Sequence, residues 1–129
     1  MQPGMLLTLT AILEVGTGLL LFLSPRVPLE ILLGIRSPGP EILVVARVAG
    51  AALLGIGVAA WLARRDNRTP SQVGVLAGIL IYNFAIASVL AFAALALRMS
   101  GFALWPVVAF HAALGGWCFV CLRPASGGE

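Results

Sequence analysis

The chain has 129 residues, of which 60% are hydrophobic and only 10% are charged. Soluble domains carry about 25% charged residues, so this sequence has too little polar material to cover a soluble globule, and its mean hydropathy of +1.06 agrees. The eight basic side chains are all arginine, and the net charge of +3 provides no basic stripe for nucleic-acid phosphates. Composition therefore predicts a membrane protein and excludes a soluble enzyme or a nucleic-acid-binding domain.

Four apolar stretches are long enough to cross a bilayer, because a hydrocarbon core of about 30 Å needs about 20 helical residues. They cover residues 5–23, 42–63, 73–97 and 102–122. Most prolines fall in the short connections, where a missing N–H does little harm, and Pro106 falls near the start of the fourth span. We therefore expect residues 1–129 to form one all-α domain, a bundle of four transmembrane helices.

The first stretch is leucine-rich, as a signal peptide is. No basic residue precedes it, however, and Glu14 interrupts the part that is uniformly apolar in signal sequences, so we expect a spanning helix. In the first connection, Glu30 is flanked by Leu29, Ile31, Leu32, Leu33 and Ile35. This pattern predicts a short interfacial helix on the bilayer, between the first and second spans.

The distribution of arginines bears on topology, because an even number of spans places both termini on one side. Near the span ends, the terminal side carries Arg64, Arg65, Arg68 and Arg123, and the other side carries Arg26, Arg36 and Arg98. The positive-inside rule therefore favours both termini in the cytoplasm of a bacterial inner membrane, although this narrow bias leaves inverted insertion open. The cluster of residues 64–68 suits contact with anionic headgroups of the lipid bilayer.

Small residues recur at intervals of four positions in three of the spans. Gly74 and Gly78 form GxxxG, the second span carries Ala46, Gly50, Ala51, Gly55 and Ala59, and the fourth carries Ala112 and Gly116. Such spacing lets helix backbones approach closely, within one chain or between chains. Because so small a bundle has little interior of its own, we expect a homo-oligomer.

Four polar residues fall deep in the predicted spans, where a central charge costs about 2.5–3.5 kcal/mol. Glu14 lies about 13 Å along its helix from residue 5, and Tyr82 and Asn83 lie at a similar depth from the same side. His111 enters from the opposite side and also reaches about 13 Å. The sequence therefore predicts a polar pocket near the midplane that binds a small ligand or ion.

Two further features surround Glu14. Thr10, Glu14, Thr17 and Gly18 share one face of the first helix, which predicts a polar seam facing protein. Arg47 is expected about 8 Å below the opposite face, within reach of Glu14, the only acid inside a span. Arg47 either pairs with Glu14 or extends toward the headgroups, and without such a pair burial favours a protonated Glu14.

Cys118 and Cys121 form a CxxC near the end of the fourth span. The pair has either a redox or metal role or none, but its place at a helix C-terminus opposes thiolate formation. His111 is the only histidine, and it is either a packing residue or one axial ligand of a haem. No cofactor is identified by the sequence, although haem or quinone stays open, and we expect no zinc site.

Two resemblances add to this picture. The segment AILEVGTG around Glu14 resembles the first helix of the small multidrug resistance transporters, in which the corresponding glutamate binds protons and cationic drugs in a dimer. The later glycine-rich and tryptophan motifs of that family are absent, and Arg47 and His111 would repel a cation. RVAGAALLGIG with Trp61, the YN pair at position 82 and LWPVVAFH resemble an uncharacterised family of small four-helix bacterial inner-membrane proteins, which implies a fold but no activity.

Together these features favour a proton-linked transporter or channel. In this hypothesis Glu14 carries the proton, Arg47 acts as gate or anion anchor, and Tyr82, Asn83 and His111 orient the ligand. The alternatives are a non-catalytic accessory or scaffold subunit, in which the polar groups only fix helix packing, and a redox protein that uses haem, quinone or the CxxC thiols. No carboxylate dyad, serine with a base or phosphate-binding glycine loop points to an enzyme.

Overall fold

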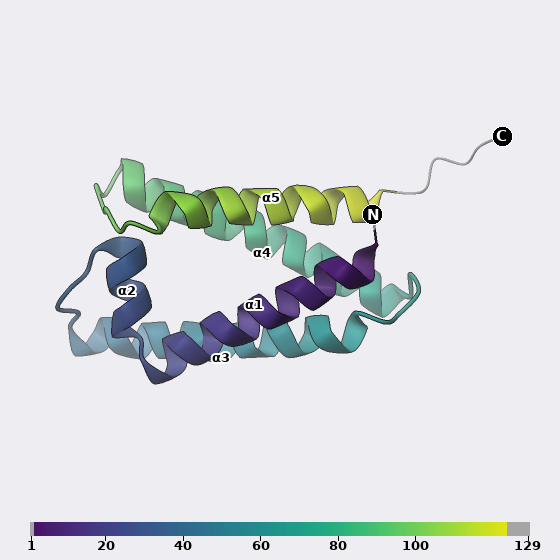
Figure 1. The fold of residues 1–129 in the computed structure, drawn as a ribbon, viewed down its shortest axis with the longest axis horizontal. Coiled ribbons are helices and arrows are strands. Elements are labelled where there is room, and N and C mark those ends of the chain that lie inside the picture. The colour runs from purple at the N-terminus through teal and green to yellow at the C-terminus, as the bar shows by residue number, and fades with distance from the viewer. Residues whose placement is uncertain (1, 124–129) are drawn as a thin grey trace.

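A computed structural model describes residues 2–123, and they form five α-helices and no strand. The helices are α1 (Pro3–Leu23), α2 (Arg26–Leu33), α3 (Pro40–Ala63), α4 (Pro70–Leu95) and α5 (Leu104–Leu122). Four of them, α1, α3, α4 and α5, are long and apolar enough to cross a membrane. The short α2 lies across one end of the bundle (Figure 1). The predicted four-helix transmembrane fold with a short helix after the first span is confirmed.

Prolines set the starts of three spans, each two or three residues before the start predicted from hydropathy. Pro3, Pro40 and Pro70 each occupy the first turn of α1, α3 and α4, where the missing N–H has no intrahelical partner to lose. At α4 the Thr69 hydroxyl also caps the helix by accepting a hydrogen bond of 3.2 Å from the Gln72 backbone N–H. The helix α5 begins at Leu104 rather than residue 102, and α4 ends at Leu95 rather than residue 97.

The four spans are arranged as two antiparallel pairs. The helix α1 packs along α3, and α4 packs along α5, whereas contacts between the two pairs are sparse (Figure 1). The α1–α3 pair depends on glycine. A Cβ atom added at Gly50 would lie 2.7 Å from the Gly18 carbonyl oxygen, and one added at Gly18 would lie 2.8 Å from the Gly50 carbonyl oxygen. These glycines therefore permit backbone contact between α1 and α3.

Some of the small-residue motifs contact a neighbouring helix in the structure, and others do not. Gly50 contacts α1, but Cβ atoms added at Gly55, Gly74, Gly78 or Gly116 would meet nothing within 4 Å. The GxxxG of α4 therefore makes no close helix contact within the described part of the chain.

The two pairs are joined at both ends of the bundle. At the end where α1 begins and α5 finishes, buried apolar side chains from all four spans, including Leu6, Leu76 and Leu114, form the hydrophobic core. At the other end, α2 ends in a left-handed glycine, Gly34, and packs on the connection between α4 and α5. There the Ala103 backbone N–H donates a 3.0 Å hydrogen bond to the carbonyl oxygen of Ile31. The helix α2 thus links the halves.

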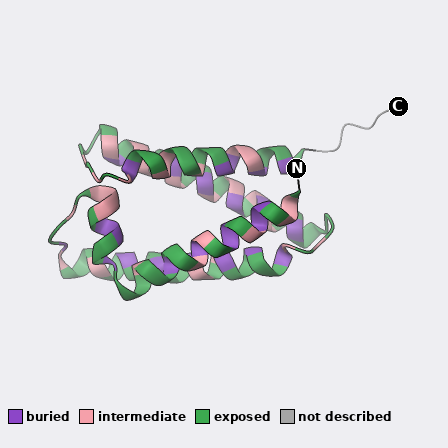
Figure 2. Cartoon of the chain, viewed as in Figure 1, coloured by how far each residue is buried: buried purple, intermediate pink, exposed green. Residues whose placement is uncertain are grey.

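The outward faces of the bundle are apolar. Figure 2 shows exposed residues along the outer surfaces of all four spans. They include Leu23, Leu62 and Ile81, which are each 70% or more exposed. A soluble monomer rarely exposes so extended an apolar surface, and a bilayer covers it. The chain is a multi-pass membrane protein.

Candidate functional site

The buried carboxylate of α1 is held across the interface between the two helix pairs. Glu14 is 4% exposed and lies near the middle of α1. Its Oε2 atom accepts a 3.0 Å hydrogen bond from the hydroxyl of Tyr82, which lies near the middle of α4. The partner of this acid is therefore a neutral hydroxyl from the other helix pair.

A second polar pair joins α4 to α5 beside the first. Asn83 is fully buried, and its Nδ2 atom donates a 2.8 Å hydrogen bond to the carbonyl oxygen of Ile79. Its Oδ1 atom lies 2.8 Å from Nδ1 of His111. Because Nδ2 is engaged with Ile79, Oδ1 faces the imidazole as an acceptor, and Nδ1 carries the proton. A neutral His111 then presents Nε2 as an acceptor to any further partner.

These two pairs touch each other. The Tyr82 and His111 rings meet edge to face, with centroids 5.7 Å apart and planes at 79°. We call Glu14, Tyr82, Asn83 and His111 the midplane cluster. Three helices contribute to it, in agreement with the common depth that counting along the sequence predicts for these residues. Tyr82 also lines a groove of about 230 Å³ between α3 and α4, so the cluster borders the outer surface.

Arg47 is not part of the cluster. Its side chain is exposed, and its Nη1 atom lies 3.5 Å from the carbonyl oxygen of Leu43 on its own helix. Within residues 2–123 the ion pair present is Arg36 with Glu30, 3.8 Å apart at the surface. The expected pairing of Arg47 with Glu14 is therefore wrong, and the alternative of an outward Arg47 holds. Ala46, the residue before Arg47, is buried, and successive residues of a helix are turned about 100° from each other.

The predicted polar seam on α1 faces protein at three of its four residues. Thr10 is fully buried one turn before Glu14, and its hydroxyl has no hydrogen-bond partner among the described residues. Gly18 is buried against Gly50, but Thr17 is exposed. The two helix pairs diverge between the middle of the bundle and α2 (Figure 1). Glu14 therefore lies where the buried part of the interface gives way to its exposed part.

The two cysteines lie in the hydrophobic core at the end of α5. Cys118 and Cys121 are both free and buried. Within residues 2–123 no three His, Cys, Asp or Glu side chains gather as a metal ion would require. This placement brings neither cysteine into the midplane cluster.

One buried polar residue escaped the sequence interpretation. Gln72 is 2% exposed, and its Nε2 atom donates hydrogen bonds to the carbonyl oxygens of Ala63, at 3.0 Å, and of Asp66. It thereby fixes the turn between α3 and α4. The pattern of a threonine followed three residues later by glutamine, Thr69 to Gln72, is a helix-capping signal that could have identified it.

Replacing Tyr82 by phenylalanine should remove the only hydrogen bond that the structure gives to the Glu14 carboxyl. A hydrogen bond accepted by a carbonyl oxygen weakens the C=O bond and lowers its stretching frequency. In infrared spectra of the protein in lipid, the C=O stretch of protonated Glu14 should therefore shift to higher frequency in the variant. Ser88→Ala is the matched control, since it removes an exposed α4 hydroxyl that bonds to Phe84. An unchanged Glu14 band in Tyr82→Phe would show that the two side chains do not touch in the membrane.

No protein-family model, curated protein or solved structure matches this chain. Its function is therefore inferred from the midplane cluster itself.

Proposed function

We propose that the protein is a proton-linked membrane transporter or channel that binds a small ligand or ion at the midplane cluster. The observation that carries this proposal is the position of Glu14, which is buried in the middle of a membrane span and, among residues 2–123, is hydrogen-bonded only to the hydroxyl of Tyr82. A carboxylate at that depth without a neighbouring cation is costly, so the site favours a bound proton or ligand cation over a bare charge.

The arrangement of the helix pairs supports a moving part. The hydrogen bond between Glu14 and Tyr82 spans the interface between the α1–α3 pair and the α4–α5 pair, which otherwise share few contacts. Protonation removes the negative charge of Glu14 and thereby weakens the hydrogen bond that its carboxyl group accepts from Tyr82. Because the two helix pairs share few contacts with each other, a change in this hydrogen bond biases how they pack together. Alternating access by rocking of two such units is a recurrent transport mechanism.

Other members of the cluster supply groups for a polar ligand. His111 presents Nε2, and the Tyr82 hydroxyl oxygen, whose proton is donated to Glu14, keeps the capacity to accept a hydrogen bond. Thr10 adds a buried hydroxyl without a partner one turn from Glu14. The role of gate or anion anchor expected for Arg47 finds no support, because that side chain points away from the cluster.

The proposal is tested by solute uptake into liposomes. Purified protein is reconstituted, exposed to an extract of small polar metabolites under an imposed pH gradient, and the liposome contents are measured by mass spectrometry. We expect at least one solute to accumulate above empty liposomes, and to lose that accumulation when the gradient is collapsed. Contents identical to those of empty liposomes would contradict the proposal.

A scaffold role is the second candidate, and one observation favours it. Both ends of the fully buried Asn83 amide are already bonded within the protein, to Ile79 and to His111. A fully satisfied buried amide is typical of residues that fix helix register. In this interpretation the cluster holds α4 against α5, and the protein acts as an accessory subunit without transport.

We also propose that the protein is a homo-oligomer, and that both termini lie in the cytoplasm of a bacterial inner membrane. The terminus proposal rests on the arginine bias, with the loop of residues 64–68 at the same end as the start of α1. The oligomer proposal rests on the exposed Gly74 and Gly78 of α4, which leave open space for a second helix. Gly78 lines the same groove as Tyr82, so a partner helix there would approach the cluster.

Replacing Gly74 and Gly78 together by isoleucine should shift the protein toward monomer, because the added side chains block close approach of a second α4. Sedimentation in detergent measures the mass, with an expected loss of at least about tenfold in association, near 1.4 kcal/mol. Gly116→Ile is the control, since it adds the same side chain to open space on α5. An oligomer that survives the double substitution would exclude this face of α4 as the interface.

A further inference from the structure

A groove runs along the outer side of the α1–α3 pair. Its deeper half, of about 470 Å³, is apolar and is lined by Ile12, Val15 and Gly16 of α1 and by Val58 and Trp61 of α3, among others. The half nearer the bundle end, of about 670 Å³, is lined by residues that include Thr8, Ile12, Arg64 and Arg65. Because Ile12 lines both halves, the two adjoin. One elongated site therefore has a basic end and an apolar end.

The basic end is held in place by an aromatic ring. The Arg64 guanidinium lies 3.5 Å from the centroid of the Trp61 ring, and Nη1 also donates to the Trp61 carbonyl oxygen. This fixes one cation at the point where the apolar half begins, with Arg65 beside it. The first turn of α1 borders the same end, but its dipole is offset by the adjacent C-terminus of α3, so the positive charge comes from the two arginines. The end of the groove is therefore electropositive.

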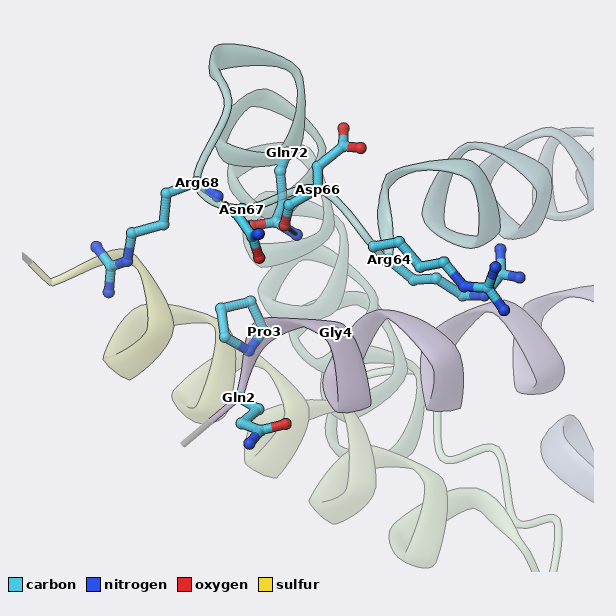
Figure 3. A pocket seen from close by; sticks show the side chains of 9 residues that line it. Gln2, Pro3, Gly4, Arg64, Asp66, Asn67, Arg68 and Gln72 are labelled. Carbon is cyan, nitrogen blue, oxygen red and sulfur yellow. Dashed lines mark hydrogen bonds between the residues drawn. The ribbon is translucent and has the colours of Figure 1, made fainter.

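The other charged residues of the loop lie elsewhere. Figure 3 shows Arg64 extending beside the first turns of α1, whereas Arg68 extends the other way, toward the end of α5. Asp66 lines the adjacent cavity under the loop, which Arg64 and Arg65 also border, but it does not line the groove. The positive charge of Arg64 and Arg65 is thus not neutralised by an acid within the groove.

The length of the groove matches one leaflet of a bilayer. From Gly4 at the basic end to Gly16 at the apolar end α1 advances about 18 Å, and half of a hydrocarbon core of about 30 Å is about 15 Å. A phospholipid whose phosphate contacts Arg64 and Arg65 would therefore extend one acyl chain as far as Gly16. Trp61, beside the phosphate level, is the residue type that favours the membrane interface.

A second copy of the chain fits this groove less well. In a symmetric dimer that met through the groove, Arg64 and Arg65 would face their own equivalents, and like charges would repel. The groove also lies on a different side of α3 from the groove at Tyr82, because Val58 and Trp61 line the first and Ile56 and Ala59 line the second. It is therefore separate from the midplane cluster and from the proposed oligomer face.

We propose that this groove is a binding site for one anionic phospholipid, with the phosphate on Arg64 and Arg65 and one acyl chain along α1 to Gly16. The site goes beyond the proposed function and does not depend on it. This site gives the arginine loop a more specific role than general attraction to lipid headgroups. Binding here requires both a fixed cation and an apolar channel.

Native mass spectrometry tests the site on full-length protein taken from vesicles of phosphatidylglycerol and phosphatidylcholine in equal amounts. We expect one phosphatidylglycerol per chain, retained at least about tenfold over phosphatidylcholine. Arg64→Gln with Arg65→Gln should bring that preference close to one. Gly16→Leu should abolish retention of either lipid, because a side chain added at Gly16 enters open space within the groove. Since the two variants act on opposite ends, either one alone tests the site if the other fails to fold.

Two control variants distinguish a lipid site from general charge attraction, from a simple phosphate site and from a protein interface. Arg123→Gln removes an arginine that is stacked on Phe119, 4.6 Å from the ring centroid, at the same end of the bundle, and Gly116→Leu adds a side chain to open space on α5. Both should retain the lipid. Three results would overturn the proposal. If Arg123→Gln lost phosphatidylglycerol as fully as the Arg64 and Arg65 variant does, the binding would be general charge attraction. If Gly16→Leu still retained phosphatidylglycerol and the protein bound added inorganic phosphate, the site would be a phosphate site without a lipid tail, and if Gly16→Leu lost a second chain instead of a lipid, the groove would be a protein interface.

Discussion

Replacing Glu14 by glutamine should reduce pH-driven solute uptake to the level of empty liposomes, a loss of at least about tenfold, or about 1.4 kcal/mol of coupling. Glutamine has nearly the same shape and its side-chain oxygen still accepts a hydrogen bond from Tyr82, but it cannot bind or release a proton. The bundle should therefore assemble as well as the parent, because no charge remains to be buried. Uptake and circular dichroism on the same preparation measure both effects.

The control for that experiment is Glu41→Gln. Glu41 lies in the first turn of α3 and is exposed, so its replacement removes the same charge outside the membrane interior. It should leave uptake unchanged. Undiminished uptake in Glu14→Gln would remove Glu14 from the mechanism and favour the scaffold interpretation.

Replacing Gly50 by valine should destabilise the packing of α1 against α3. Its Cβ would lie 2.7 Å from the Gly18 carbonyl oxygen and 2.7 Å from the backbone nitrogen of Phe22. These are backbone atoms, which move only with the helix, so α1 and α3 must separate. Overpacking of this kind costs about 1–3 kcal/mol. Unfolding of the micellar protein by added denaturing detergent, followed by circular dichroism, measures the free-energy difference.

Gly55→Val supplies the comparison on the same helix. A Cβ at Gly55 meets nothing within 4 Å, and the change in helix propensity from glycine to valine is the same at both positions. Gly55→Val should therefore be as stable as the parent or nearly so. Equal stability of the two variants would contradict the close contact between α1 and α3.

Hydropathy is sufficient to predict the four spans, because a bilayer dictates both the length and the composition of a helix. It places three helix starts too late, because Pro3, Pro40 and Pro70 are not apolar enough to count as span residues although proline is suited to a first turn. The pairing of the spans is not predictable from composition. Backbone contact at Gly50 and open space at Gly55 arise from the rotation of one helix against another, which spacing alone does not give.

The candidate site shows the same division. Counting residues from the membrane faces places Glu14, Tyr82 and His111 at one level, and the structure brings them together. The depth of a residue in the membrane does not determine, however, whether its side chain points into the bundle or outward. Arg47 lies at a depth from which it could reach Glu14, but its position around α3 turns it outward. Thr17 shares a stripe with the buried Thr10 but is exposed, because the two helix pairs diverge toward α2.

The most direct test of proton binding at Glu14 is its reaction with dicyclohexylcarbodiimide in membranes at a series of pH values. This apolar reagent modifies protonated carboxyl groups in apolar surroundings, and Glu14 is the only acid within the spans apart from Glu41 in the first turn of α3. We expect an adduct on Glu14, identified by mass spectrometry, that is abundant at acidic pH and declines as the pH rises. An adduct of constant yield would mean that Glu14 never releases its proton, and no adduct at any pH would mean that it never holds one. Either result would contradict a proton-linked function.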